Sequence, residues 1–197
     1  IAHGDVIVLD GATGTEIERL GGKMDGAAWC AVANMNDPEK VQQVHEAYMR
    51  VGADVITTNT FATCRHVLAG VGLDNDTVAI NQQAVKLARK ARDAVAPSRP
   101  VAIAGSMSNT VAWQPGFISP DPRFIPSERQ ETANYREMAN TLADSGVDFL
   151  ILEMMLDIDH ASRALEAAVA TGLPVWVGVS CSLEDDGAVV GWDLATQ

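Results

Sequence analysis

Short apolar segments alternate with stretches of helical periodicity along the whole chain. The apolar segments are rich in Val, Ile and Leu and cover residues 6–10, 55–61, 101–106, 149–155 and 174–181. None of them alternates regularly between apolar and polar positions, which is typical of strands buried on both faces, as in parallel sheets. The pattern therefore predicts five parallel strands.

Between these strands, apolar side chains recur at helical spacing, which predicts helices that include residues 41–49, 80–91, 135–142 and 161–168. Asp37 followed by Pro38 is a typical helix start, and Ser127 with Gln130 fits a capping box. Glycines stand where three of the helices should end, at Gly52, Gly146 and Gly172. The strict alternation of strands and helices predicts an α/β fold with a parallel sheet.

Two architectures fit this alternation. A doubly wound sheet of five strands suits the length of 197 residues. A (β/α)8 barrel needs about 250 residues, so the chain would hold only part of one, about five strands and four helices. The glycines after the first strand, Gly11 and Gly14, match neither a dinucleotide-binding turn nor a P-loop. The residue pattern by itself leaves both architectures open.

Charge and composition exclude several classes of protein. The chain has 14 Lys and Arg against 26 Asp and Glu, a net charge of -12, which argues against binding to nucleic acid or anionic membranes. No apolar run reaches the ~18 residues of a membrane span, and no signal peptide is visible. Three scattered cysteines are too few for a disulfide scaffold. We therefore expect a single cytoplasmic domain over residues 1–197.

Polar residues stand at the carboxyl ends of the predicted strands, where both architectures bind ligands. These positions are Asp10-Gly11, Asn59-Thr60, Ser106 to Asn109, Glu153 and Ser180-Cys181. Glu153 interrupts an apolar run, where a carboxylate is costly unless it is paired. It is a candidate for holding an ammonium group or acting as a base, or for a structural strand-end acid. Asp10 is either a turn former or a ligand contact that the following glycine makes accessible.

The segment Leu9-Asp-Gly-Ala-Thr-Gly-Thr-Glu-Ile17 resembles the opening motif of the homocysteine S-methyltransferase family. That family includes the homocysteine-binding module of cobalamin-dependent methionine synthase and the betaine- and S-methylmethionine-dependent enzymes. Similar motifs follow in order at the other predicted strands, in residues 52–61, 105–106, 146–153 and 174–191. Residues 107–109 depart from the Gly-Pro that usually follows the third motif. The resemblance covers essentially the whole chain.

The resemblance implies a (β/α)8 barrel that binds homocysteine at the carboxyl ends of its strands and transfers a methyl group to the thiolate, giving methionine. It implies that Asp10 and Gly11 contact the amino-acid end of homocysteine and that Glu153 holds its ammonium group. Asn59 and Thr60 would line the mouth. The sequence does not name the methyl donor, but the proline-rich stretch 109–126 is where a preference for one donor could be encoded.

The resemblance also implies zinc held by three cysteine thiolates, which keeps the substrate sulfur as a thiolate. The family's zinc cysteines lie on the sixth strand and near the eighth, beyond Gln197, and Cys181 is not expected to be a ligand. We therefore expect a truncated barrel that has no catalytic residue or metal ligand of its own and is inactive alone. Open sheet edges predict self-association or pairing with the missing half.

Two other interpretations remain at this point. The chain could be a non-catalytic partial barrel that binds a small amino acid or a partner chain. It could instead be an unrelated α/β enzyme on a doubly wound sheet, with Asp10 and Glu153 as an acid–base pair.

Overall fold

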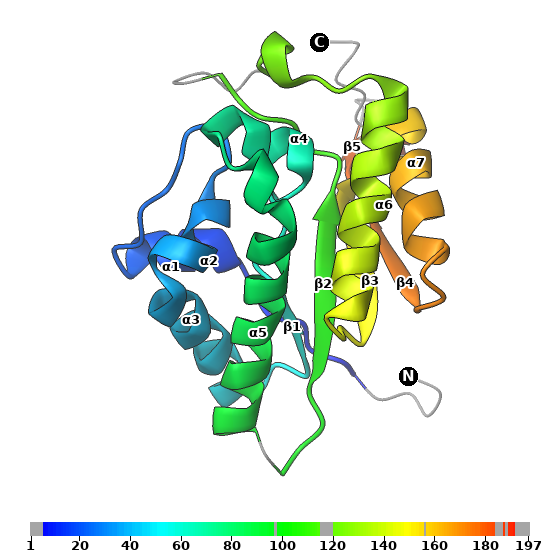
Figure 1. The fold of residues 1–197 in the computed structure, drawn as a ribbon. Helices are drawn as coiled ribbons and strands as arrows, with labels where there is room; N and C mark the ends of the chain where they lie inside the picture. Colours follow the sequence, from blue (N-terminus) through cyan, green and yellow to red (C-terminus); the bar gives the residue numbers. More distant parts are fainter. Residues whose placement is uncertain are drawn as a thin grey trace.

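A parallel sheet of four strands runs through the molecule (Figure 1). The computed structural model describes residues 6–96, 98–114, 120–155, 157–183, 187 and 189–191. The strands lie in the order β1-β2-β3-β4, and their bounds are Val55–Thr57, Ala102–Ser108, Phe149–Met155 and Val175–Val179. Leu9 forms a parallel bridge with Val55, so the N-terminal segment lies beside β1. The spatial order therefore follows the chain order.

The register of the strands is regular up to Leu152 of β3. Val55 pairs with Ala102, and Ala104 pairs with Phe149. The predicted strand over residues 6–10 is reduced to the single bridge at Leu9, and the predicted strand 55–61 ends at Thr57. The last predicted strand, 174–181, is divided between β4 and a short hairpin of β5 (Cys181–Leu183) with β6 (Val189–Gly191).

Each predicted helix is present and extends beyond its predicted residues. The helices are α3 (Pro38–Arg50), α5 (Thr77–Val95), α6 (Glu128–Asp144) and α7 (Ile158–Val169). The backbone N–H of Ser127 donates to Gln130 Oε1 at 3.0 Å, in the predicted capping box. Asp37 precedes α3, but its carboxylate accepts from Lys40 Nζ at 2.6 Å instead of capping the helix. All three predicted end glycines have positive φ, which glycine adopts without strain.

Short helices that the sequence pattern did not predict fill the connections. They are α1 (Thr13–Arg19), α2 (Ala33–Asn36), α4 (Arg65–Leu68) and the 3-10 turns Cys30–Val32, Ala69–Val71, Asp74–Asp76 and Pro122–Phe124. They are too short to show helical periodicity, so packing rather than pattern determines them. Part of the proline-rich stretch, 115–119, lies outside the described residues.

Successive side chains of the strands point to opposite faces of the sheet, and both faces are packed. Leu150 and Leu152 of β3 join the main core with the helices, whereas Phe149 and Ile151 join a smaller cluster on the other face. There Phe149 packs against Trp176, with ring centroids 4.6 Å apart. The prediction of strands buried on both faces is confirmed for β3.

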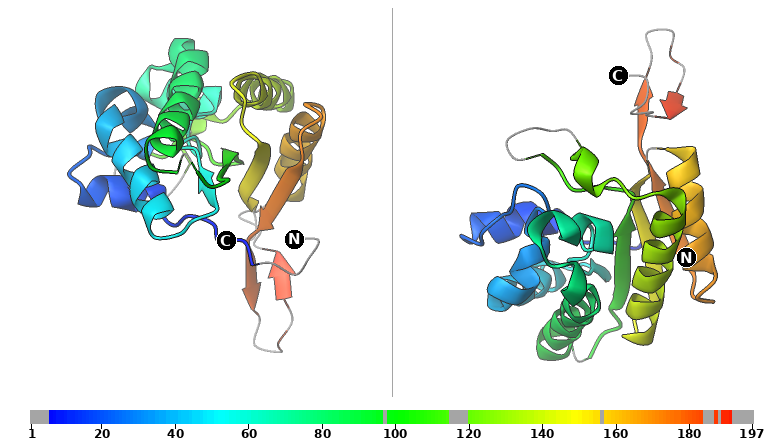
Figure 2. Two further views of the ribbon diagram at one scale, coloured as in Figure 1. Left: turned by 90° about the horizontal axis from the view of Figure 1, so that it is seen from below. Right: turned by 45° about the horizontal axis from the view of Figure 1, so that its top comes forward.

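The long helices all lie on one face of a curved sheet (Figure 2). A doubly wound sheet carries helices on both faces, whereas a barrel carries them only on the outside. The structure is therefore a segment of a (β/α) barrel, and the doubly wound alternative is wrong. No helix among the described residues is long and apolar enough to span a membrane.

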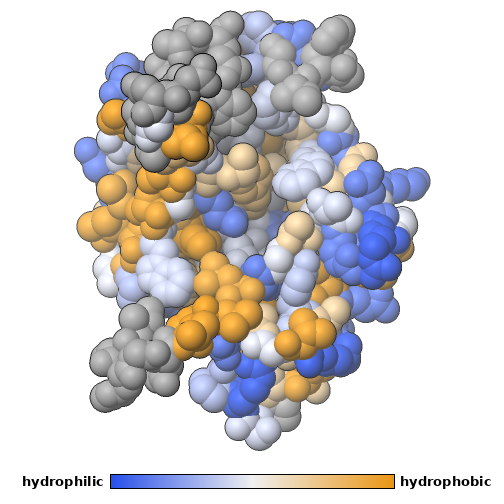
Figure 3. All heavy atoms as spheres, turned by 180° about the vertical axis from the view of Figure 1, so that it is seen from behind, coloured by the Kyte–Doolittle hydropathy of each residue, from blue (hydrophilic) through white to orange (hydrophobic). Residues whose placement is uncertain are grey.

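Apolar side chains are exposed at both ends of the strand order. On the N-terminal side these include Val8 and Leu9, and on β4 they include Val177 and Val179, which is 63% exposed. Seen from behind, the molecule shows apolar surface spread over one side (Figure 3). An apolar surface of this kind is typical of a region that another structural element covers.

Candidate functional site

The carboxyl ends of the strands bring Asp10 and Glu153 to the face of the sheet that carries no helices. The backbone N–H of Asp10 donates to Val55 O at 3.0 Å, which fixes Asp10 beside the start of β1. Glu153 follows Phe149 and Ile151 at two-residue spacing on β3, so its side chain projects to their face. Asp10 binds Thr57 at the end of β1 and Glu153 binds Ser106 of the neighbouring β2, so both carboxylates lie at the same edge of the sheet.

Asp10 is held by Thr57. Its carboxylate accepts hydrogen bonds from Thr57 N and from Thr57 Oγ1, both at 2.8 Å. Burial and, to a smaller extent, the charge of Glu153 raise the pKa of Asp10 to about 6, although the bonds from Thr57 act in the opposite direction. Asp10 is therefore a carboxylate whose charge is only partly stabilised by the protein.

Glu153 is held by Ser106, whose Oγ donates to Glu153 Oε2. Burial raises the pKa of Glu153, and the hydrogen bond from Ser106 offsets part of this effect. The register shifts between Leu152 and Met155, and Met154 has a φ of 53°, so a bulge turns the strand immediately after Glu153. No ion pair among the described residues includes Asp10 or Glu153.

Two glycines make room at this edge of the sheet. A Cβ on Gly11 would lie 2.9 Å from Tyr48 Oη, and Tyr48 Oη donates to Ala12 O at 3.3 Å. A Cβ on Gly14 would lie 2.9 Å from both Cys30 Sγ and an indole carbon of Trp29. Glycine is thus required here because aromatic side chains approach the backbone closely.

Asn59 and Thr60 are buried next to the carboxylates. Thr60 Oγ1 donates to Ser106 O at 2.7 Å, which joins β1 to β2. Asn59 binds Cys30 and Asn34 through its side chain. The structure thus brings both residues to the strand ends but engages their polar atoms within the chain.

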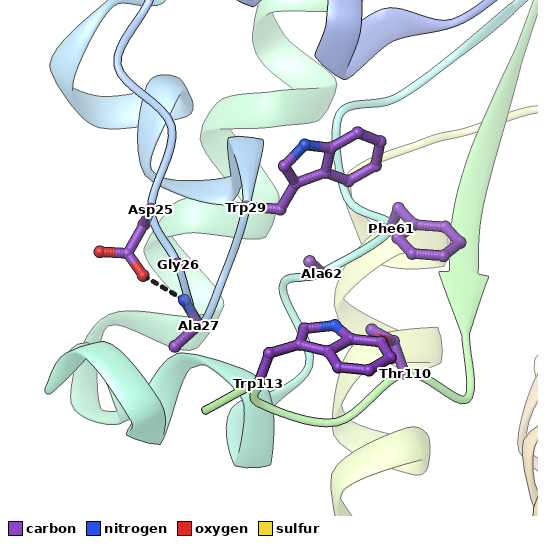
Figure 4. Close-up of a pocket in the computed structure, with 8 residues that line it drawn as sticks. All are labelled: Asp25, Gly26, Ala27, Trp29, Phe61, Ala62, Thr110 and Trp113. Atoms are coloured by element: carbon purple, nitrogen blue, oxygen red, sulfur yellow. Dashed lines mark hydrogen bonds between the residues drawn. The ribbon is translucent and has the colours of Figure 1, made fainter. Parts of the chain in front are cut away.

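An aromatic cavity of about 220 Å³ lies beside this region (Figure 4). The rings of Trp29, Phe61 and Trp113 surround it, and Ala62, Thr110 and residues 25–27 complete its lining. Trp29 and Phe61 pack edge to face with centroids 6.0 Å apart. Phe61 and Thr110 follow the carboxyl ends of β1 and β2, so the cavity lies at the same edge of the sheet as the carboxylates.

The sequence matches the profile of the homocysteine S-methyltransferase family over residues 7–196. The chain belongs to this family. It is 29% identical to a homocysteine S-methyltransferase of Escherichia coli K12 over 171 residues, which are 84% of this chain and 55% of the relative. It is also 29% identical to a selenocysteine methyltransferase of Astragalus bisulcatus over 170 residues, 76% of this chain and 50% of the relative. The chain thus spans about half the length of these curated relatives.

Solved structures of the family agree with the fold. The homocysteine methyltransferase MmuM of Escherichia coli in its metallated form superposes with a TM-score of 0.75 and 26% identity, over 95% of this chain and 67% of MmuM. Its apo form gives a TM-score of 0.67 over 95% of this chain. The four parallel strands therefore cover part of a homocysteine methyltransferase barrel, as predicted from the sequence motifs.

The described part of this family member contains no cluster of three or more His, Cys, Asp or Glu side chains that could hold a metal ion. Cys30 and Cys64 are buried, and Cys181 is exposed. Burial raises the pKa of both buried thiols to about 12, which disfavours the thiolate that a metal requires. The described residues do not fit a zinc site, and the expected position of the zinc cysteines beyond Gln197 stays a prediction.

The sequence pattern missed the aromatic residues of the cavity. It singled out only the stretch 109–126, which contributes Thr110 and Trp113. Trp29 and Phe61 belong to a turn and to the end of a strand segment, and neither position has a periodic signal. The scarcity of aromatic residues, 5% of the chain, is the one feature that could have drawn attention to them.

Proposed function

We propose that this chain carries the amino-acid-binding part of a homocysteine S-methyltransferase. The observation that carries the proposal is the pair of partly desolvated carboxylates, Asp10 and Glu153, which face the same side without a cationic partner in the described chain. The ammonium group of homocysteine would supply that charge. Gly11 follows Asp10 directly and makes room for Tyr48, and the resemblance implies that Gly11 contacts the amino-acid end together with Asp10.

In the proposed reaction, the sulfur lone pair of homocysteine forms a bond to the methyl carbon of a donor. The bond between this carbon and the donor breaks, and its electron pair stays on the donor atom, which loses its positive charge. The thiol proton leaves to solvent, and the product is methionine. The family resemblance implies zinc to hold the thiolate in the complete domain, but no step is assigned to the described residues through it.

The aromatic cavity is the proposed site for the donor. The faces of Trp29, Phe61 and Trp113 attract a sulfonium or quaternary ammonium group by cation–π interaction. A carboxylate-rich site and an aromatic cavity side by side suit a reaction between an amino acid and a cationic methyl donor.

Calorimetric titration of the purified chain with L-homocysteine tests the proposal. We expect binding, and we expect the analogue that lacks the amino group, 4-mercaptobutanoate, to bind at least about tenfold more weakly, since the carboxylates have no ammonium to bind. Equal affinities for the two compounds would contradict the proposal.

A binding module without catalysis is the second proposal, and the lack of a metal-ligand cluster in the described residues favours it for this chain alone. We expect no methionine when the chain is incubated with homocysteine and either S-methylmethionine or betaine. Methionine formation, detected by mass spectrometry, would show that the chain is catalytic.

We further propose that the apolar ends of the strand order associate with the elements that complete the barrel, in another chain or a second copy. Val177 and Val179 are exposed on β4, as is the side chain of Ile158, which is 83% exposed at the start of α7. A stable monomer of 20.9 kDa in multi-angle light scattering would argue against this association.

The free cysteines agree with a reducing cytoplasm, which is our proposed location.

A further inference from the structure

Trp29 has a backbone conformation that needs support. Its φ is 48°, in the left-handed region that residues other than glycine rarely adopt. Asp25 supports it from one side, because Asp25 N donates to Trp29 O at 2.9 Å and the Asp25 carboxylate accepts from Ala27 N at 2.7 Å. On the other side the chain continues into Cys30, which is buried.

Asn59 fixes Cys30 with both ends of its amide. Its Oδ1 accepts from Cys30 Sγ at 2.9 Å, and its Nδ2 donates to Cys30 O at 2.9 Å. The same Nδ2 donates to Asn34 Oδ1 at 3.1 Å, and Asn34 Nδ2 donates to Asn59 O at 2.8 Å. Both amide protons are therefore used inside the protein, so Asn59 has no hydrogen left to donate to a ligand.

The segment that contains Asn59 also contacts the indole itself. Phe61, two residues later, packs edge to face on Trp29, and both rings line the aromatic cavity (Figure 4). Gly14 lies against the indole, in a position where a Cβ would collide with it. The end of the β1 segment thus holds the backbone of Trp29 through Cys30 and its ring through Phe61.

We propose that Asn59 is a positioning residue, which acts through Cys30 to hold Trp29 at the wall of the aromatic cavity. The family resemblance implies that Asn59 lines the mouth, and this proposal adds that Asn59 shapes the site without contacting a ligand. The effect of Asn59 on methyl-donor binding rests on the proposed function. The positioning of Cys30 and Trp29 by Asn59 does not depend on that function.

Replacement of the Asn59 side-chain amide by a carboxylate tests whether Asn59 positions Cys30 and Trp29. In Asn59→Asp the carboxylate cannot donate to Cys30 O or Asn34 Oδ1, although its size is unchanged. The matched control is Asn81→Asp. Asn81 is also buried, and its Nδ2 donates to two carbonyl oxygens, of Thr63 at 3.1 Å and Thr77 at 2.8 Å.

The three cysteines report the result through their rates of alkylation by iodoacetamide, followed by peptide mass spectrometry. In the unmodified sequence, we expect Cys181 to react and Cys30 and Cys64 to be protected. Asn59→Asp should raise the rate at Cys30 at least about tenfold and leave Cys64 protected. Asn81→Asp should leave Cys30 protected. If Asn59→Asp exposes both buried thiols equally, or neither, the proposal is overturned.

If Asn59→Asp does not fold, two substitutions of Cys30 test the same hydrogen bond from the other side. Cys30→Ser keeps a donor for Asn59 Oδ1, whereas Cys30→Val removes it. The emission of Trp29, obtained by subtracting the corresponding Trp29→Phe protein, should stay unchanged in Cys30→Ser and shift to the red in Cys30→Val. Identical spectra would overturn the proposal.

Titration with trimethylsulfonium, followed by tryptophan fluorescence, separates this inference from the proposed function. We expect Asn59→Asp to weaken binding at least about tenfold and Asn81→Asp to leave it unchanged. If trimethylsulfonium does not bind the unmodified chain, the donor site is wrong. The alkylation pattern then still decides whether Asn59 positions Trp29. If it binds both Asp variants equally well, Asn59 does not position the cavity wall.

Discussion

The buried carboxylate of Glu131 and the carboxylates of Asp10 and Glu153 differ in how the protein balances their charge. Glu131 of α6 is almost fully buried and accepts from His160 Nδ1 at 2.5 Å, from Arg163 Nε and from Tyr135 Oη at 3.1 Å. Burial acts to raise the pKa of Glu131, but His160 and Arg163 outweigh it and hold the pKa below its usual range. At the strand ends, by contrast, burial raises the pKa of Asp10 to about 6.

The difference separates a structural carboxylate from the two carboxylates that we propose bind a ligand. The protein supplies cations for Glu131 from α7, and the charge stabilises the packing of α6 on α7. Among the described residues, only hydroxyl and amide groups donate to Asp10 and Glu153, and no cation balances their charge. A buried carboxylate without a cation is thus the stronger indication of a binding site.

Removal of Glu131 should have the largest effect on stability. Glu131→Gln leaves Arg163 without its buried partner, and we expect the free energy of unfolding to fall by about 3 kcal/mol in chemical denaturation. Glu137→Gln is the control, since Glu137 pairs with Arg65 at 2.7 Å in a half-exposed position and should cost less than about 1 kcal/mol. Similar losses of stability in Glu131→Gln and Glu137→Gln would show that the buried ion pairs of Glu131 stabilise the protein no more than an exposed ion pair does.

Asp10→Asn and Glu153→Gln should weaken ligand binding without destabilising the protein, in contrast to Glu131→Gln. Each removes a desolvated negative charge that has no cation, so we expect the stability to stay the same or rise. The affinity for L-homocysteine should fall, by about 2 kcal/mol or roughly thirtyfold for each variant, in isothermal titration calorimetry. A variant that loses stability but keeps its affinity would assign these carboxylates to structure.

The pKa of Asp10 makes both the stability of the protein and its affinity for homocysteine depend on pH. Its folded-state pKa of about 6 lies above the ordinary 3.8, so its contribution to stability is complete below 3.8 and is lost as the pH rises through about 6. Ligand binding needs the charged form, and we expect the affinity for homocysteine to fall about tenfold per pH unit below 6. Calorimetry at several pH values should show this fall, and Asp10→Asn should remove the part that Asp10 contributes and leave the part that comes from Glu153.

Ser106→Ala should have the smallest effect. It removes the hydroxyl that donates to Glu153, which raises the pKa of Glu153 and costs about 1 kcal/mol of stability. Ser108→Ala is the matched control on the same strand, because Ser108 Oγ donates to Phe61 O at 2.7 Å. Only Ser106→Ala should shift the pH profile of homocysteine binding upward. An identical profile in both variants would show that Ser106 does not stabilise the charged form of Glu153.

Much of the fold could be predicted because its signals are local. The run that contains Leu150 and Leu152 is apolar at every position up to Glu153, and such a run fits only a strand packed on both sides. Glu153 itself was identified because a carboxylate in that run requires a special reason. The predicted strand 6–10 is reduced to one bridge, between Leu9 and Val55, although Val8 O and Asp10 N also bond to the backbone of residues 54–55.

The candidate site was predictable only in part. Asp10 and Glu153 could be placed at strand ends, since parallel strands end at one edge of the sheet. The role of Asn59 could not, because its partners lie 25 and 29 residues earlier in the chain, at Asn34 and Cys30. Trp29 was missed for the same reason, since its contact with Phe61 depends on a turn that no pattern predicts.

The sequence by itself determined the alternation of strands and helices, the family and the carboxylates at the strand ends. These follow from periodicity and from motifs, which are properties of neighbouring residues. The tertiary structure decided that the helices cover one face, that Glu131 has its cations on α7, and that Asn59 turns inward to Cys30. Such contacts join residues far apart in the chain, and their energies depend on distance and burial that only the folded protein defines.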